Sequence, residues 1–253
     1  MGHNKLHKGD RVLVSFEYGA STKPEIHPMS IALLQHLFSK GIKVYTVPLW
    51  PEGLMMAKYA LVEVVESNLF NIKELQNVIS KIITEKGPIE ILINNAANDE
   101  RHNIEDVTEE FWNNRMNINL RHYFFTVQSV REAMIKNKGG VIVNIGSASW
   151  MVGQGGMAAY TAAKSGVVGL TRSFARDLGE YNIRVNSVVP GWTITERQLE
   201  KWLTPESEAD MMKKQCIKKR LMPSDIAKAV LFFSSDQSSG CTNQSYVVDN
   251  GWL

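Results

Sequence analysis

The sequence predicts an α/β protein in which helices cover both faces of a doubly wound, mostly parallel sheet. Two observations carry this prediction. Short apolar runs rich in β-branched residues alternate along the 253 residues with longer runs of helical period, and glycine or proline closes many of these runs. Such alternation is typical of βαβ units with right-handed crossovers. Because the composition shows no break that would mark a linker, we expect one domain over residues 1–253.

Valine and isoleucine dominate the runs that are expected to form strands, because these side chains suit a pleated and buried backbone. These runs span residues 11–16, 42–47, 61–65, 89–93, 141–145, 183–189 and 245–248. The segments expected to form helices place apolar residues three and four positions apart. They span residues 28–40, 72–86, 109–136, 158–180 and 225–234. Gly41, Gly87 and Gly139 follow three of these helices and favour their termination.

Composition excludes several kinds of function. Hydrophobic residues make up 44% of the chain and charged residues 21%, which is typical of a folded globular protein. A net charge of +2 gives no reason to expect a nucleic-acid or membrane partner, and no apolar run could span a bilayer. The six histidines show no spacing typical of a metal site, so none is expected. Cys216 and Cys241 indicate no disulfide framework, and the cytoplasm is the expected location.

A tyrosine and a lysine four residues apart form the strongest chemical signal. Tyr160 and Lys164 stand near the start of a predicted helix, where side chains at this spacing share one face. A neighbouring ammonium ion favours the phenolate, so it lowers the pKa of a tyrosine and fits that tyrosine for general acid–base catalysis. Taken alone, the pair is a weak signal, and two unrelated side chains on a helix surface would be the better interpretation.

Two further polar residues precede this pair. Ser147 follows the strand expected at 141–145, where its hydroxyl could hold a substrate oxygen opposite the tyrosine. Asn119 lies inside the helix expected at 109–136, where asparagine is unfavourable. Its amide is either exposed to solvent or holds a water molecule that links to Lys164.

Small and polar residues follow the fourth and sixth expected strands. In a parallel sheet, the carboxyl ends of the strands form the edge at which ligands bind. These residues are Asn95, Ala96 and Ala97 after the fourth strand and Pro190, Gly191, Thr193 and Thr195 after the sixth.

In this order and spacing, the segments from residue 72 to residue 253 resemble the short-chain dehydrogenase/reductase family. The resemblance implies a Rossmann-like domain and a catalytic tetrad of Asn119, Ser147, Tyr160 and Lys164. In such a tetrad Tyr160 would move the proton of the substrate hydroxyl, while Lys164 would lower its pKa and hold the nicotinamide ribose. Ser147 would position the reacting oxygen, and Asn119 would anchor a relay water. The implied cofactor contacts are Ser15, Gly19, Ser21, Asn68, Leu69, Asn95, Ala96, Ala97, Tyr160, Lys164, Pro190, Gly191, Thr193 and Thr195.

Several segments resemble the aldose 1-dehydrogenase branch of that family more narrowly. They include NNAANDERH at residues 94–102, GSASWMVGQGG at 146–156 and PGWTITERQ at 190–198. The resemblance implies oxidation of a sugar at C1 to the lactone. Polar side chains suit several hydroxyl groups, and tryptophans suit the C–H face of a ring, although each could instead belong to a solvated loop or to the core. The expected substrate residues are Asn98, Arg101, His102, Ser147, Trp150, Gln154, Tyr160 and Trp192.

The front of the chain departs from the family. Members carry a Thr-Gly-x-x-x-Gly-x-Gly loop, whose glycines let the backbone approach the pyrophosphate at a helix N-terminus. Residues 15–30 contain one glycine, Gly19, together with two acidic residues and two prolines. Pro48 stands where NAD-using members have an acidic residue, and no arginine nearby favours NADP. The expected cofactor is therefore NAD or NADP, without a preference.

Three interpretations stay open. In the first, the atypical loop still binds the cofactor, because Pro28 suits the first turn of a helix whose amides would face a phosphate. In the second, the chain is a degenerate, non-catalytic member with impaired dinucleotide binding. In the third, it is a dehydrogenase of another secondary alcohol. The complete tetrad favours an enzyme.

Two further features are expected beyond the site. Residues 192–220 should form a lid over the substrate, with Thr204 as the cap and Pro205 at the first position of a helix. The family resemblance implies a homotetramer built on the helices at 109–136 and 158–180 and on the C-terminal strand. Both helices carry apolar residues on more than one side, which is consistent with a second packing face.

Overall fold

The computed structural model describes residues 11–16, 43–48, 63–64 and 67–253. In this part of the chain a seven-stranded sheet has the order β3-β2-β1-β4-β5-β6-β7, and every neighbouring pair is parallel. The order reverses between β1 and β4, which creates the switch point at which doubly wound sheets bind ligands. The predicted fold class is confirmed.

The strands agree with the sequence prediction to within two residues at each end. They are β1 (Arg11–Phe16), β2 (Lys43–Pro48), β3 (Glu63–Val64), β4 (Ile91–Asn94), β5 (Gly140–Ile145), β6 (Ile183–Pro190) and β7 (Ser245–Val248). The described helices are α3 (Ile72–Lys86), α4 (Glu109–Met116), α5 (His122–Lys136), α6 (Ala158–Leu178), α7 (Glu196–Lys201), α8 (Pro205–Lys214) and α9 (Pro223–Ser234). The helix expected at 28–40 lies outside the described residues.

The single helix expected at 109–136 is wrong in one respect. A π-helical turn, η1 (Asn117–Arg121), separates α4 from α5. Three short 3₁₀ turns, η2 (Ala148–Trp150), η3 (Gly179–Tyr181) and η4 (Asp236–Ser238), complete the helical elements of the described chain. Within these residues, no helix is both long and apolar enough to cross a membrane.

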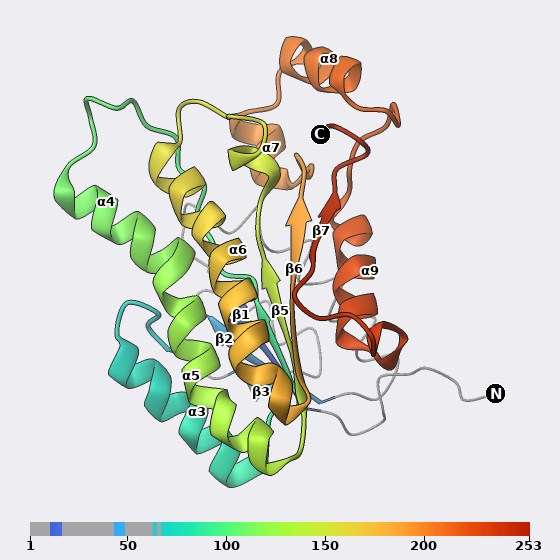
Figure 1. Ribbon diagram of the computed structural model, residues 1–253. Coiled ribbons are helices and arrows are strands. Elements are labelled where there is room, and N and C mark those ends of the chain that lie inside the picture. The colour runs from blue at the N-terminus through green and yellow to red at the C-terminus, as the bar shows by residue number, and fades with distance from the viewer. Residues whose placement is uncertain (1–10, 17–42, 49–62, 65–66) are drawn as a thin grey trace.

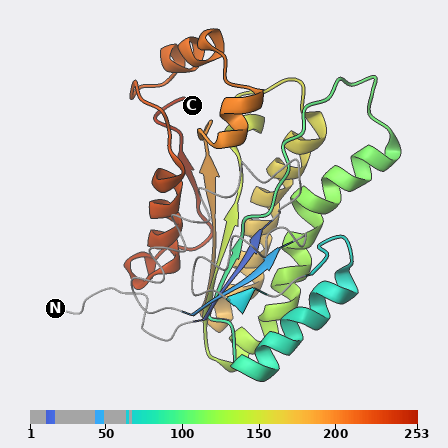
Figure 2. The same ribbon diagram turned by 180° about the vertical axis from the view of Figure 1, so that it is seen from behind.

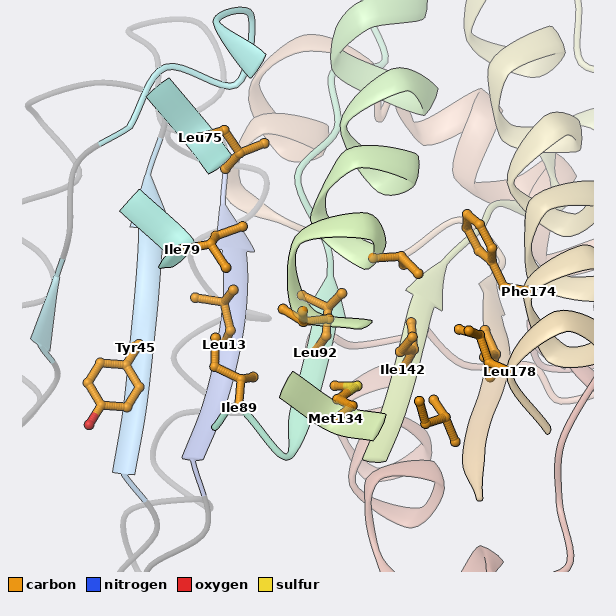
Figure 3. Close-up of a cluster of buried hydrophobic side chains, with 14 of the residues drawn as sticks. Leu13, Tyr45, Leu75, Ile79, Ile89, Leu92, Met134, Ile142, Phe174 and Leu178 are labelled. Carbon is orange, nitrogen blue, oxygen red and sulfur yellow. The ribbon is translucent and has the colours of Figure 1, made fainter. Parts of the chain in front are cut away.

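Alternate side chains of each central strand pack on opposite faces of the sheet, which explains the continuous apolar runs. Leu13, Leu92 and Ile142 face α3, α5 and α6, where Figure 3 shows them beside Leu75 and Phe174. Their neighbours on the same strands belong to a second buried cluster, which packs against α9. Figures 1 and 2 show this arrangement, with α3, α5 and α6 on one side of the sheet and α9 on the other.

A buried row of polar side chains joins two strands to two helices. The amide of Asn94 at the end of β4 donates to Asn144 Oδ1 on β5 at 2.9 Å and accepts from Thr126 Oγ1 on α5 at 2.8 Å. Asn144 Nδ2 donates in turn to Thr171 Oγ1 on α6 at 3.0 Å. Because buried polar groups are costly without partners, this row fixes how the helices sit on the strands that carry the site.

Replacing the central amide should destabilise the fold. Asn144→Leu leaves the Asn94 amide without its acceptor, so we expect the free energy of unfolding to fall by about 1–3 kcal/mol. Urea unfolding followed by circular dichroism measures the change. Gln128→Leu is the matched control, because it removes an exposed amide bond between two helices. Equal stability losses in the two variants would contradict the argument.

Candidate active site

A cavity of about 470 Å³ opens where β4, β5 and β6 end. Segments far apart in the chain meet there because parallel strands present their carboxyl ends at one edge of the sheet. In Figure 1 this edge lies beneath α7 and α8. The predicted site residues that line it are Asn95, Ala97, Arg101, Ser147, Gln154, Tyr160, Lys164, Pro190, Gly191, Trp192, Thr193 and Thr195.

The ammonium group of Lys164 is buried and held by two acceptors. Lys164 Nζ donates to the Tyr123 hydroxyl at 2.9 Å and to the Ile145 carbonyl at 2.8 Å. Burial raises the pKa of Tyr123, so that phenol stays protonated and donates to the same carbonyl at 2.9 Å. Lys164 Nζ also lies 5.8 Å from the centroid of the Tyr160 ring. The positive charge is therefore fixed beside the Tyr160 ring.

Ser147 starts the η2 turn directly after β5. Its hydroxyl accepts from the Ser149 amide at 3.2 Å and donates to the Ser149 hydroxyl at 2.9 Å. These two bonds fix the oxygen at the wall of the cavity that Tyr160 also lines. Ser147 and Tyr160, which are 13 residues apart in the sequence, therefore line the same cavity.

Asn119 lies in the π-helical turn and is fully buried, which excludes solvent exposure as the reason for this mid-helix asparagine. Its Nδ2 donates to the Arg115 carbonyl at 2.9 Å and to the Asn98 carbonyl at 3.0 Å. Its Oδ1 accepts from the Asn98 amide at 2.8 Å. The side chain therefore ties the loop after β4 to the wide helical turn, and both of its N–H groups are used in doing so.

Comparison with known proteins decides which family has this arrangement. A family model described as enoyl-(acyl carrier protein) reductase matches residues 37–253. The chain belongs to the short-chain dehydrogenase/reductase family. It is accordingly an oxidoreductase, and members of the family use a nicotinamide dinucleotide. The predicted family and enzyme class are confirmed.

Curated relatives and solved structures extend the likeness. The D-xylose 1-dehydrogenase of Caulobacter vibrioides is 45% identical over 185 residues, 73% of each chain. The probable galactose dehydrogenase of Rhizobium meliloti is 40% identical over 187 residues, 74% of this chain and 73% of that one. The ligand-free aldohexose dehydrogenase of Thermoplasma acidophilum has the same fold, with a TM-score of 0.83 at 24% identity, covering 97% of this chain and 94% of that one. A putative short-chain alcohol dehydrogenase from Sinorhizobium meliloti superposes with a TM-score of 0.85 at 29% identity, covering 98% and 97%.

Three of the predicted substrate residues of this dehydrogenase do not line the cavity. Asn98 is buried behind it and bonded to Asn119. His102 Nε2 accepts from the Ala159 amide at 3.3 Å, so this imidazole caps the start of α6. Trp150 is half-buried in η2.

The predicted cofactor residues outside the cavity wall are distributed along three segments. Ser15 Oγ accepts from the Asn95 amide at 3.1 Å and so joins the ends of β1 and β4. Ala96 and Leu69 are buried in the core, whereas Asn68 is exposed. Gly19, Ser21 and the remainder of the loop at 15–30 beyond Phe16 lie outside the described residues.

The residues that line the cavity fit the nicotinamide half of a dinucleotide. Asn95 Nδ2 is buried there and has no hydrogen-bond partner among the described residues. An amide N–H and the neighbouring Lys164 ammonium can both donate to ribose hydroxyls. An orphaned buried donor is costly unless a ligand satisfies it, so this part of the site suits a bound cofactor.

The cavity residues that the sequence analysis did not assign to the site include Gln198, Trp202 and Trp252. Gln198 was part of a recognised segment, but nothing in its residue type marked it as buried. Trp202 comes from the end of α7, and Trp252 follows β7. The position of Trp252 has a recognisable signal, because a residue just after the last parallel strand reaches the same edge of the sheet as the tetrad.

His122 is a buried imidazole beside this site that the tetrad does not use. Burial, together with the charge of Lys164, lowers the pKa of His122 to about 3, although backbone groups of Asn117 and Ile118 act in the opposite direction. The folded protein therefore keeps this imidazole neutral at a pH where the unfolded chain, with a pKa of 6.5, takes up a proton.

This difference makes stability depend on pH. Between pH 6.5 and about 3 the unfolded state binds the extra proton, so His122 should cost roughly 1 kcal/mol of stability for each unit of acidification. Urea unfolding of the wild type and of His122→Gln at pH 7, 6 and 5 measures the slope, which should be smaller in the variant. An imidazole resonance of His122 that titrates near pH 6.5 in the folded protein would refute this.

Proposed function

We propose that the protein oxidises an aldose sugar at C1 to the lactone, with NAD or NADP as the hydride acceptor. The observation that carries this proposal is one cavity in which Tyr160, Lys164 and Ser147 meet a wall rich in tryptophan and polar side chains. The relatives named as xylose and galactose dehydrogenases, at 45% and 40% identity, support the same class of substrate.

The chain supplies the proton chemistry of this reaction. Tyr160 takes the proton of the C1 hydroxyl, and Ser147, whose hydroxyl proton would turn from Ser149 to the substrate, donates a hydrogen bond that positions the same oxygen. The fixed ammonium of Lys164, 5.8 Å from the Tyr160 ring centroid, stabilises the phenolate that starts the reaction. A bound nicotinamide would supply the acceptor for the hydride that leaves C1 as its bond to oxygen becomes a carbonyl.

The cavity also has the chemistry that recognises a sugar ring. The indoles of Trp192, Trp202 and Trp252 line it and offer flat apolar surfaces with polar edges. Arg101 lines the cavity as well, and its guanidinium carbon lies 4.9 Å from the centroid of the Trp202 ring. Together with Gln154, these groups can bond several hydroxyls while an indole covers the C–H face of the ring.

The rest of the chain serves the same site in this proposal. Residues 1–253 form one domain in which the atypical loop at 15–30 holds the pyrophosphate. Residues 192–220 act as the substrate lid, which is supported by the cavity contacts of α7 and α8 through Gln198 and Met211. A homotetramer is supported by two large aromatic side chains on α4 and α5, Trp112 and Phe124, which are 41% and 40% exposed. The expected location remains the cytoplasm.

A substrate screen tests the proposal. Pentoses and hexoses offered with NAD and with NADP should give reduced cofactor, detected by its absorbance, with at least one aldose turned over well above simple secondary alcohols. The preferred dinucleotide follows from the same assay. Titration with NADH and NADPH, followed by quenching of tryptophan emission, is the control for cofactor binding. Binding with turnover of non-sugar alcohols alone would overturn the aldose assignment, and no binding would overturn the atypical loop as a cofactor site.

The proton transfer has its own test. Tyr160→Phe keeps the ring but removes the group that takes the proton, so kcat should fall by about 100-fold or more. Tyr181→Phe is the control, because Tyr181 lies in η3 at the opposite end of α6. Both variants should fold and bind the dinucleotide as the wild type does. Wild-type turnover by Tyr160→Phe would refute the assigned role.

A further inference from the structure

The short helix α7 has the opposite burial pattern to an ordinary amphipathic helix: its polar side chains are buried and an apolar one is exposed. Arg197 and Gln198 are 1% and 4% exposed, while Leu199 beside them is 48% exposed. Charged and amide side chains are seldom buried without partners, and a leucine is normally the residue that a helix hides. The helix is therefore docked through polar contacts rather than through apolar packing.

These contacts converge on one buried carboxylate in the loop after β4. Asp99 is 7% exposed, and its Oδ1 lies 3.3 Å from Arg197 Nη2. Its Oδ2 accepts a hydrogen bond of 3.1 Å from Gln198 Nε2.

The contact with Asp99 decides which way the Gln198 amide points. A carboxylate only accepts hydrogen bonds, so Gln198 must turn its NH₂ group toward Asp99 and its oxygen away. That oxygen accepts the indole N–H of Trp192 at 2.7 Å. The indole N–H lies in the ring plane, so this bond fixes the plane of a ring that lines the substrate cavity.

We propose that Gln198 is a positioning residue, oriented by Asp99, that sets the face which Trp192 presents to the sugar. The part of this inference that names a sugar as the substrate rests on the proposed function. A fixed indole face favours aldoses that offer a C–H face of matching shape. The entropy cost of binding is then smaller, because the indole ring of Trp192 is already ordered before the substrate binds. Asp99 and Gln198 act through Trp192 and need not touch the substrate.

The competing explanation is that the polar contacts only fasten α7 to the loop. A double-mutant cycle separates the two, because a positioning residue acts through its target and a fastening residue does not. Gln198→Met removes both amide contacts at nearly constant size. Trp192→Phe keeps an aromatic face but lacks the N–H that Gln198 holds. Gln76→Met is the matched control for this substitution. It removes an exposed amide hydrogen bond from Gln76 on α3 to Gln128 on α5, and neither residue lines the cavity.

We expect Gln198→Met to raise KM for the best aldose by about 5- to 10-fold with little change in kcat, as for a lost hydrogen bond that orders the binding surface. In the Trp192→Phe background, the same substitution should change KM by less than about twofold. An equal loss in both backgrounds would show fastening alone and overturn the proposal. The control Gln76→Met should have wild-type KM.

A second readout does not depend on turnover and so survives a failure of the proposed function. The indole N–H resonance of Trp192, identified by its loss in Trp192→Phe, should exchange slowly with solvent in the wild type and at least about tenfold faster in Gln198→Met. Gln198→Glu tests the part played by Asp99, because it keeps an acceptor for the indole but sets two carboxylates against each other. This variant should also exchange fast, and wild-type protection in either variant would overturn the inference.

Discussion

A buried ammonium ion is the constraint around which this site is arranged. Removing the charge of Lys164 from water costs several kcal/mol unless hydrogen bonds replace its hydration. The Ile145 carbonyl and the Tyr123 hydroxyl supply them at 2.8 and 2.9 Å. Burial keeps Tyr123 a neutral phenol, and burial together with the lysine charge keeps His122 a neutral imidazole. The fixed positive charge lies 5.8 Å from the centroid of the Tyr160 ring, which also lines the cavity.

The sheet makes this arrangement possible by bringing distant residues to one edge. Parallel pairing of β4, β5 and β6 aligns the ends of three strands, and the amides of Asn94 and Asn144 join those ends to α5 and α6. The side chains of the proposed tetrad are therefore held by the interior of the fold. At the other part of the cavity, a buried ion pair joins α7 to the loop after β4.

The sequence predicts the parts of this structure that depend on local pattern. Strand periodicity places all seven strands, and the tetrad residues are recognisable from their order. The π-helical turn could not be predicted. The sequence shows only that a polar residue, Asn119, lies inside a helix. It does not show that the side-chain amide of Asn119 donates to the Arg115 carbonyl in place of a backbone N–H. The inverted burial of α7 also has no local signal, because the partner of Arg197 lies almost a hundred residues away. His102 is the opposite case, in which the sequence suggests a binding role that the local structure does not need. Its imidazole is typical of a binding site, but it caps the start of a helix.

The π-helical turn also changes how the long helix should be compared between related chains. Successive residues of an α-helix are turned by about 100°, so Trp112 and Phe124 would lie about 120° apart on an uninterrupted helix. The wide turn at Asn117–Arg121 takes in about one extra residue, which reduces the angle to roughly 20°. Both side chains are in fact exposed. A one-residue deletion in this turn would therefore be a local change: it would leave the two residues 11 positions apart on an uninterrupted helix, where about 100° per residue again gives roughly 20°, and both aromatic rings would stay on one side of the helix.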